Sequence, residues 1–139
     1  MDSSSLVIEQ KEYLLLKRFI NLSSYHKDKI LLKNLARLSH DLEMAQIYPD
    51  IEMPKNVVRI NSIVTLSSKY FDMKTFQLVL PAQDKLDHMN VSILTHLGAA
   101  LIGQTEGSTI TLEHLSSLKK VKITEVIQQN KNISLDMVL

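Results

Sequence analysis

The chain has 139 residues, 45% of them apolar, which suits one ordinary domain or a small domain with an appendage. Its formal net charge of +1 gives no overall electrostatic reason to expect direct binding to nucleic acid or to an anionic membrane. Cysteine is absent, and this excludes thiol catalysis, disulfides and cysteine-based zinc sites.

The first third of the chain is expected to begin with a helix over residues 8–20, because this segment is rich in helix formers and lacks glycine and proline. Four apolar side chains are expected on one stripe of this helix: Ile8, Leu15, Phe19 and Leu22. Serine and asparagine residues break the helix over residues 21–29. Within this break, Asp28 is a suitable N-cap or first-turn acid for the next helix.

A second helix follows, and it carries the clearest periodicity in the chain. Its apolar residues are spaced alternately four and three apart: Leu31, Leu35, Leu38, Leu42 and Ala45. This heptad spacing predicts a seam that packs against a partner helix. The first helix is the nearest partner, so we expect an antiparallel helical hairpin. A seam of about two heptads is too short to be stable alone, and we expect it to pack on the rest of the protein.

Two prolines, Pro49 and Pro54, end the helical region. The segment around them reads as a linker and sets the predicted domain boundary. We expect a helical hairpin over residues 1–50 and a second domain over residues 51–139.

The second domain is expected to consist mainly of short strands separated by turns. Five strands are predicted, over residues 57–66, 74–80, 91–94, 108–112 and 119–127. Residues 91–110 contain all three glycines of the chain, and Thr95 is expected to cap a short helix there. Short strands around one short helix predict an antiparallel sheet folded about that helix, and hence an α+β fold.

No catalytic or metal-binding motif is present in the sequence. The five histidines have no metal-ligand spacing, and the glycines form no phosphate-binding loop. The basic cluster Lys119, Lys120 and Lys122 could touch a phosphate backbone, although the solvated face of a strand is the favoured interpretation. We therefore expect a binding module with no cofactor. The absence of a membrane span and of a basic signal region predicts a cytoplasmic location.

The order of several short motifs resembles the Rnk-like branch of the Gre transcription-factor family. These motifs are EMP at residues 52–54, NVV at 56–58, NS at 61–62, LVLPA at 78–82, VSIL at 91–94, GAALIG at 98–103 and the turn glycine Gly107. The resemblance runs over residues 38–127 and implies an FKBP-like C-terminal domain. It also implies a hairpin that approaches bacterial RNA polymerase at its secondary channel, with nucleic acid met only indirectly, through the transcription complex.

Within this resemblance, two segments are expected to contact polymerase. The first is the loop formed by Thr95, His96, Leu97 and Gly98. The second is the hairpin tip formed by Ser24, Tyr25, His26, Lys27 and Asp28. His96 stands where the family usually has proline, and Ser108 stands where an aspartate usually follows the turn glycine.

The resemblance predicts a non-enzymatic regulator of transcription elongation that binds polymerase and competes with long-hairpin Gre factors. Those factors carry acids at the tip that help to hold a catalytic magnesium, whereas this tip offers one carboxylate between Lys27 and Lys29. A factor that stimulates transcript cleavage remains an alternative. A prolyl isomerase or chaperone-like domain is a further one, although fold alone does not imply that activity.

Overall fold

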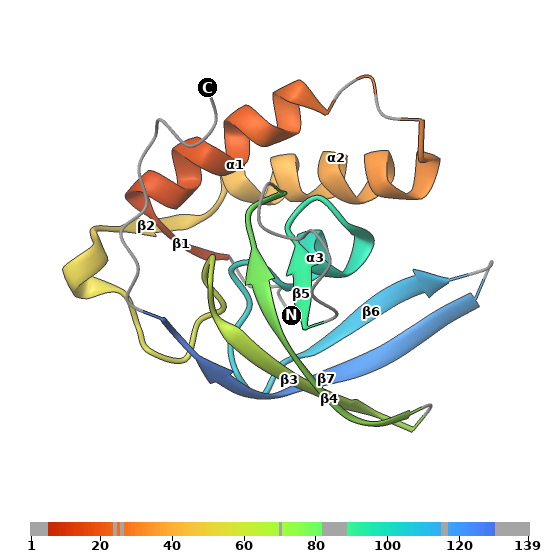
Figure 1. Cartoon of the computed structure of the whole chain (residues 1–139). Helices are drawn as coiled ribbons and strands as arrows, with labels where there is room; N and C mark the ends of the chain where they lie inside the picture. The colour runs from red at the N-terminus through yellow and green to blue at the C-terminus, as the bar shows by residue number, and fades with distance from the viewer. Residues whose placement is uncertain are drawn as a thin grey trace.

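The helical first third of the chain folds as a hairpin that lies across one side of the molecule (Figure 1). The computed structural model describes residues 6–23, 25, 27–69, 71–81, 89–114 and 117–129. Helix α1 (Gln10–Leu22) and helix α2 (Lys29–Glu43) run in opposite directions, as expected from the short break between them. At about 1.5 Å per residue, each helix is roughly 20 Å long.

The first helix starts later than predicted. Residues 8 and 9 belong to strand β1 (Val7–Glu9), which pairs in parallel with β2 (Gln46–Tyr48). This pairing across the base of the hairpin is a long-range contact that helical propensity alone does not reveal. Ile8 is buried as expected, but Leu22 is 66% exposed. Leu22 lies in the last turn of α1, on its exposed side.

The seam predicted on α2 is confirmed. Its four helical leucines, Leu31, Leu35, Leu38 and Leu42, are each no more than 3% exposed. The helix contacts α1, the expected partner, and also contacts the short helix α3 (His96–Leu101). Ala45 lies just beyond the end of α2 and is partly buried against the core. The hairpin therefore packs on the rest of the protein rather than standing alone.

The remaining strands form one curled five-stranded sheet in the order β5-β4-β3-β7-β6. They are β3 (Ile63–Ser68), β4 (Phe71–Val79), β5 (Asn90–Ser92), β6 (Thr109–His114) and β7 (Ser117–Ile127). Neighbouring strands are antiparallel except β4 and β5, which are parallel. The predicted α+β class, with helices first and the sheet after them, is confirmed.

The first predicted strand is shorter than expected, because residues 57–62 do not extend the sheet. Asn61 has a φ of 75°, a left-handed conformation that interrupts an extended strand. Val57 instead forms an isolated antiparallel bridge with Thr105. The alternating residues Val58 and Ile60 are nevertheless buried, so the pattern predicted burial correctly where it misplaced the strand boundary.

Strand β7 and the segment around the two prolines show further local detail. Val121 and Ile123 of β7 are buried while Lys120 and Lys122 are exposed, as the alternation predicts. The predicted linker contains a short 3-10 helix, η1 (Asp50–Glu52). Most of the predicted loop over residues 82–90 and most of the tail over 128–139 fall outside the described residues.

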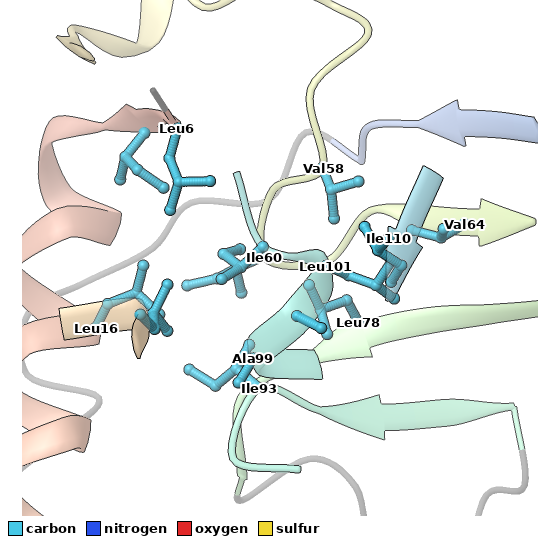
Figure 2. Packing of buried hydrophobic residues seen from close by; sticks show 14 of the residues in the cluster. Leu6, Leu16, Val58, Ile60, Val64, Leu78, Ile93, Ala99, Leu101 and Ile110 are labelled. Carbon is cyan, nitrogen blue, oxygen red and sulfur yellow. The ribbon is translucent and has the colours of Figure 1, made fainter. Parts of the chain in front are cut away.

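Helix α3 lies between the hairpin and the sheet (Figure 1). Its fully buried Leu101 is surrounded by residues from separate segments, among them Val58, Leu78 and Ile110 (Figure 2). One hydrophobic cluster extends from Leu6 to Val126 and includes residues on both sides of position 50. The domain boundary placed there stays a prediction. Among the described residues, no helix is long and apolar enough to cross a membrane.

Gly98 allows α3 to approach the end of β5 closely. A Cβ atom at this position would lie 2.1 Å from the Ser92 carbonyl oxygen and 2.8 Å from the Ile93 Cα. Because both atoms belong to the backbone, the clash cannot be relieved by a side-chain rotation. We expect Gly98→Ala to lower the free energy of unfolding by about 3 kcal/mol, at the upper end of the usual overpacking range.

Gly107→Ala is the matched control for this prediction. Gly107 has a φ of +92°, but a Cβ there would meet no atom within 4 Å. The same substitution therefore introduces backbone strain of about 1 kcal/mol without a clash. Urea unfolding of both variants would measure the difference, and equal losses would contradict the steric role assigned to Gly98.

Candidate functional site

The two segments expected to contact polymerase meet in the structure. The Asp28 Oδ2 atom at the hairpin tip lies 3.0 Å from the His96 Nε2 atom at the start of α3. These residues are 68 positions apart in sequence, and both side chains are partly exposed. The tip and the α3 loop, which are separate segments in the sequence, are therefore in contact through this pair.

Asp28 is committed to several partners at once. Its Oδ1 atom accepts hydrogen bonds of 3.0 Å from the backbone N–H groups of Ile30 and Leu31, as expected of an N-cap. The hydrogen bond from Leu31, followed by the contact with His96, holds the pKa of Asp28 below its usual value. The carboxylate is thus anchored as an anion by the start of α2 and by α3.

The loop before α3 is fixed by its own hydrogen bonds. The Thr95 hydroxyl accepts a 3.0 Å hydrogen bond from the Gly98 N–H, which confirms the predicted cap. The same hydroxyl donates to the Ser92 carbonyl at 2.7 Å. Gly98 is buried, and Leu97 is partly buried against the core. Of the four residues predicted in this loop, His96 provides a side-chain hydrogen bond to the hairpin tip.

Two other residues of the hairpin tip are exposed to solvent. Tyr25 is 93% exposed, and Lys27 is exposed as well. Ser24 and His26 lie outside the described residues. The polymerase-contact role of both segments stays a prediction.

Arg37 makes a second contact between the hairpin and α3. Its Nη2 atom donates a 3.1 Å hydrogen bond to the Ala99 carbonyl, and its Nη1 atom lies 2.9 Å from the Asp41 carboxylate. Together with the Asp28–His96 pair, this contact holds α2 along α3 at two points. The site therefore has a defined geometry rather than that of a free hairpin arm.

A largely buried ion network at the base of the hairpin was not predicted from the sequence. The Glu12 Oε2 atom accepts from Arg59 Nε at 2.8 Å and lies 2.7 Å from Arg59 Nη2. The other Glu12 oxygen accepts a 3.1 Å hydrogen bond from the Ile60 N–H. Arg59 Nη2 also lies 2.9 Å from Asp50 and 3.8 Å from Glu9. This network ties α1 to the segment that enters the sheet.

Burial dominates the electrostatics of this network. Glu12 is 2% exposed, and its burial raises the pKa of the carboxyl group even though Arg59 and the Ile60 N–H favour the charged form. One sequence signal could have revealed this residue. Glu12 falls between Ile8 and Leu15 on the predicted apolar stripe, where a charged side chain requires a partner.

The described residues offer little to a metal ion. No group of three or more His, Asp or Glu side chains in that part of the chain is arranged to hold one. The Glu9, Glu12 and Asp50 carboxylates converge, but the guanidinium of Arg59 occupies the space between them.

Asp28 has two roles, as the N-cap of α2 and as the partner of His96, and two substitutions would separate them. Asparagine can also cap a helix, so Asp28→Asn should keep α2 intact while it weakens the contact with His96. Asp28→Ala should remove both and lower the melting temperature further. Because the pKa of Asp28 is lowered on folding, its contribution is present above the ordinary aspartate range and is lost as the pH falls through the lowered value.

Thermal unfolding from pH 7 down to pH 2 would measure this contribution. The melting temperature of the wild type should approach that of Asp28→Ala at the acid end, where both lack an anion. A difference that stayed constant with pH would contradict the role of the charge.

The protein has an α+β fold in which a curled sheet surrounds one short helix and follows an N-terminal helical hairpin. Residues 53–128 match the family described as "Transcription elongation factor, GreA/GreB, C-term". Since this match covers more than half of the chain, the protein belongs to the GreA/GreB family of transcription elongation factors. The resemblance to the Gre transcription-factor family noted in the sequence is thereby confirmed.

The chain is similar to several solved structures. A prokaryotic transcription elongation factor GreA/GreB from Nitrosomonas europaea has a TM-score of 0.73 and 23% identity, covering 91% of this chain and 100% of its own. Gfh1 of Thermus aquaticus has a TM-score of 0.49 and 18% identity over 91% of this chain and 100% of its own. No curated protein sequence gives a significant match. At these identities, the Nitrosomonas structure supports the fold alone.

Proposed function

We propose that this protein is a non-enzymatic regulator of transcription elongation that binds bacterial RNA polymerase near its secondary channel and competes with cleavage-stimulating Gre factors. Membership of the GreA/GreB family supports the choice of partner. The proposal that this protein does not stimulate cleavage is based on the carboxylate content of the hairpin tip. Its one carboxylate, Asp28, is held by two backbone N–H groups and by His96.

A cleavage factor needs carboxylates at its tip that are able to share a magnesium ion with polymerase. Magnesium requires oxygen ligands in a nearly ideal octahedral arrangement. Here Lys27 and Lys29 flank Asp28, and both are exposed. Two cations beside a single anchored carboxylate oppose the approach of a divalent cation. The tip chemistry therefore favours binding and competition over stimulation of cleavage.

A purified system would test this proposal. Tagged protein should retain bacterial core polymerase, and a stalled elongation complex should show no added transcript cleavage. Excess protein should reduce the cleavage produced by a long-hairpin Gre factor. Absence of retention with purified components would refute the proposal.

The cleavage alternative has its own decisive variant. If the wild type stimulated transcript cleavage and Asp28→Ala abolished the stimulation, the tip would be acting through a metal ion. Asp28→Asn would serve as the matched control, because it retains the helix cap without the negative charge. A peptide isomerisation assay at the uncatalysed rate would remove the prolyl isomerase alternative.

A further inference from the structure

The distal half of the hairpin has a charge very different from that of the chain as a whole. Residues 13–37 contain six lysine and arginine residues and one acid, whereas the rest of the chain contains ten such bases and fourteen acids. The one acid, Asp28, is paired with His96. The small net charge of the protein therefore conceals a strongly basic hairpin end.

Exposed apolar side chains lie on the same part of the hairpin. We use the term outer ridge for Leu14, Arg18 and Leu22, which are spaced four residues apart along α1 and are all exposed. Leu14 is 46% exposed and Leu22 is 66% exposed, while Leu15 and Leu16 face the core. Residues at this spacing form a continuous ridge that can insert into a groove of another helix.

Basic and aromatic groups surround the outer ridge. Lys17 and Asn21 are exposed beside it, and Tyr25 lies beyond its end with 93% of its surface exposed. Lys17 Nζ lies 5.5 Å from the centre of the Tyr13 ring, which keeps this charge close to the helix. Tyrosine and arginine are enriched in protein interfaces, where each combines an apolar body with a polar end.

We infer that the outer ridge is a second docking surface, which takes an acidic protein surface with an apolar groove at its centre. The inference rests on the proposed function and names polymerase as the partner that carries this surface. Leu14 and Leu22 would fill the groove, and Lys17 would face a carboxylate beside it. This charge arrangement excludes a basic partner surface, because like charges would then be brought together on docking.

A nucleic-acid partner fits the outer ridge less well. A phosphate backbone uses basic and hydrogen-bonding side chains, but gains nothing from two exposed leucines. Among the described residues of the hairpin, Tyr25 is the one strongly exposed aromatic side chain available for base stacking. The combination of leucines with basic residues therefore favours an acidic protein.

Titration of the full chain with purified core polymerase would test the inference. Leu14→Gln with Leu22→Gln should weaken binding about tenfold or more, which is the effect of removing a central apolar contact. Lys17→Glu should weaken binding at low salt and have less effect at high salt, because salt screens exposed charges. Each variant should keep the melting temperature of the wild type, since the three side chains lie outside the core.

The outer face of the sheet supplies a matched control. Leu118 is 70% exposed, and Lys122 is an exposed lysine on the same strand. Leu118→Gln with Lys122→Glu changes the same chemistry on a different surface, and binding should remain at the wild-type level. If these substitutions weakened binding as much as those on the outer ridge, the effect would not be specific and the inference would be wrong.

The outcomes separate this inference from the proposed function. Wild-type binding that persists in the outer-ridge variants would overturn the inference and leave the proposed function standing. Absence of wild-type binding would overturn both. Single-stranded RNA or duplex DNA bound through Lys17, but unaffected by the leucine substitutions, would identify the surface as a nucleic-acid site and also overturn the inference.

Discussion

Replacing Arg59 with methionine is expected to lower the free energy of unfolding by about 3–5 kcal/mol, because one member of a buried ion pair is removed. The partner carboxylate, Glu12, is 2% exposed, and it would be left in its buried site with no cation in contact. Methionine fills a volume similar to that of the arginine stem, so loss of packing contributes little. Urea denaturation at pH 7, followed by circular dichroism, would measure the loss.

Glu12→Gln in the Arg59→Met background is the control for this effect. The amide oxygen of glutamine can still accept the hydrogen bond from the Ile60 N–H, but it carries no charge. The double variant should therefore recover much of the stability lost in the single one. If Arg59→Met alone stayed within about 0.5 kcal/mol of the wild type, the network would contribute no more than an ordinary surface contact.

The loss in Arg59→Met should depend on pH in a defined direction. Burial already raises the pKa of Glu12, and removal of Arg59 takes away the largest opposing influence. A carboxyl group whose pKa is raised on folding stabilises the folded state below its unfolded pKa, and this contribution disappears as the pH rises through the folded pKa. The variant should thus come closer to the wild type as the pH falls from neutrality toward the ordinary glutamate range. A loss that grew on acidification would contradict this account.

The elements of this fold that depend on local pattern were predictable. The heptad spacing of α2 predicted its buried face, and the Thr95 and Asp28 caps were identified from residue type alone. Features set by distant contacts were not. Strand β1 exists because residues near position 8 pair with residues near position 47, and no local pattern records this pairing. The turn at Asn61 likewise depends on a single left-handed residue within an apparently alternating segment.

The candidate site was predictable in its parts but not in its assembly. The tip and the α3 loop were each selected on resemblance, whereas their contact through Asp28 and His96 depends on how α2 packs along α3. The Glu12–Arg59 pair was missed because its partners are 47 residues apart. A charged residue on an apolar stripe indicates that a partner exists, but the sequence does not identify that partner.

Leu38→Ala should cost about 2–5 kcal/mol of stability, the range found when a buried leucine is truncated. Leu38 is 1% exposed and lies in the α2 seam, and α2 contacts both α1 and α3. Because neighbouring side chains relax only partly into the space, the variant loses packing with the hairpin and with the sheet domain together. Chemical denaturation would measure the loss, and one cooperative transition would indicate that the hairpin and the sheet unfold together.

Leu22→Ala is the matched control for the loss of stability in Leu38→Ala. Leu22 belongs to the same hairpin but is 66% exposed, so its truncation should change stability by no more than about 0.5 kcal/mol. If Leu38→Ala melted like the wild type, the seam would be serving a partner instead of the core. Large loss at Leu38 with none at Leu22 would assign α2 to holding the molecule together. Leu22 would then contribute little to stability, and its exposed side chain would be available for docking.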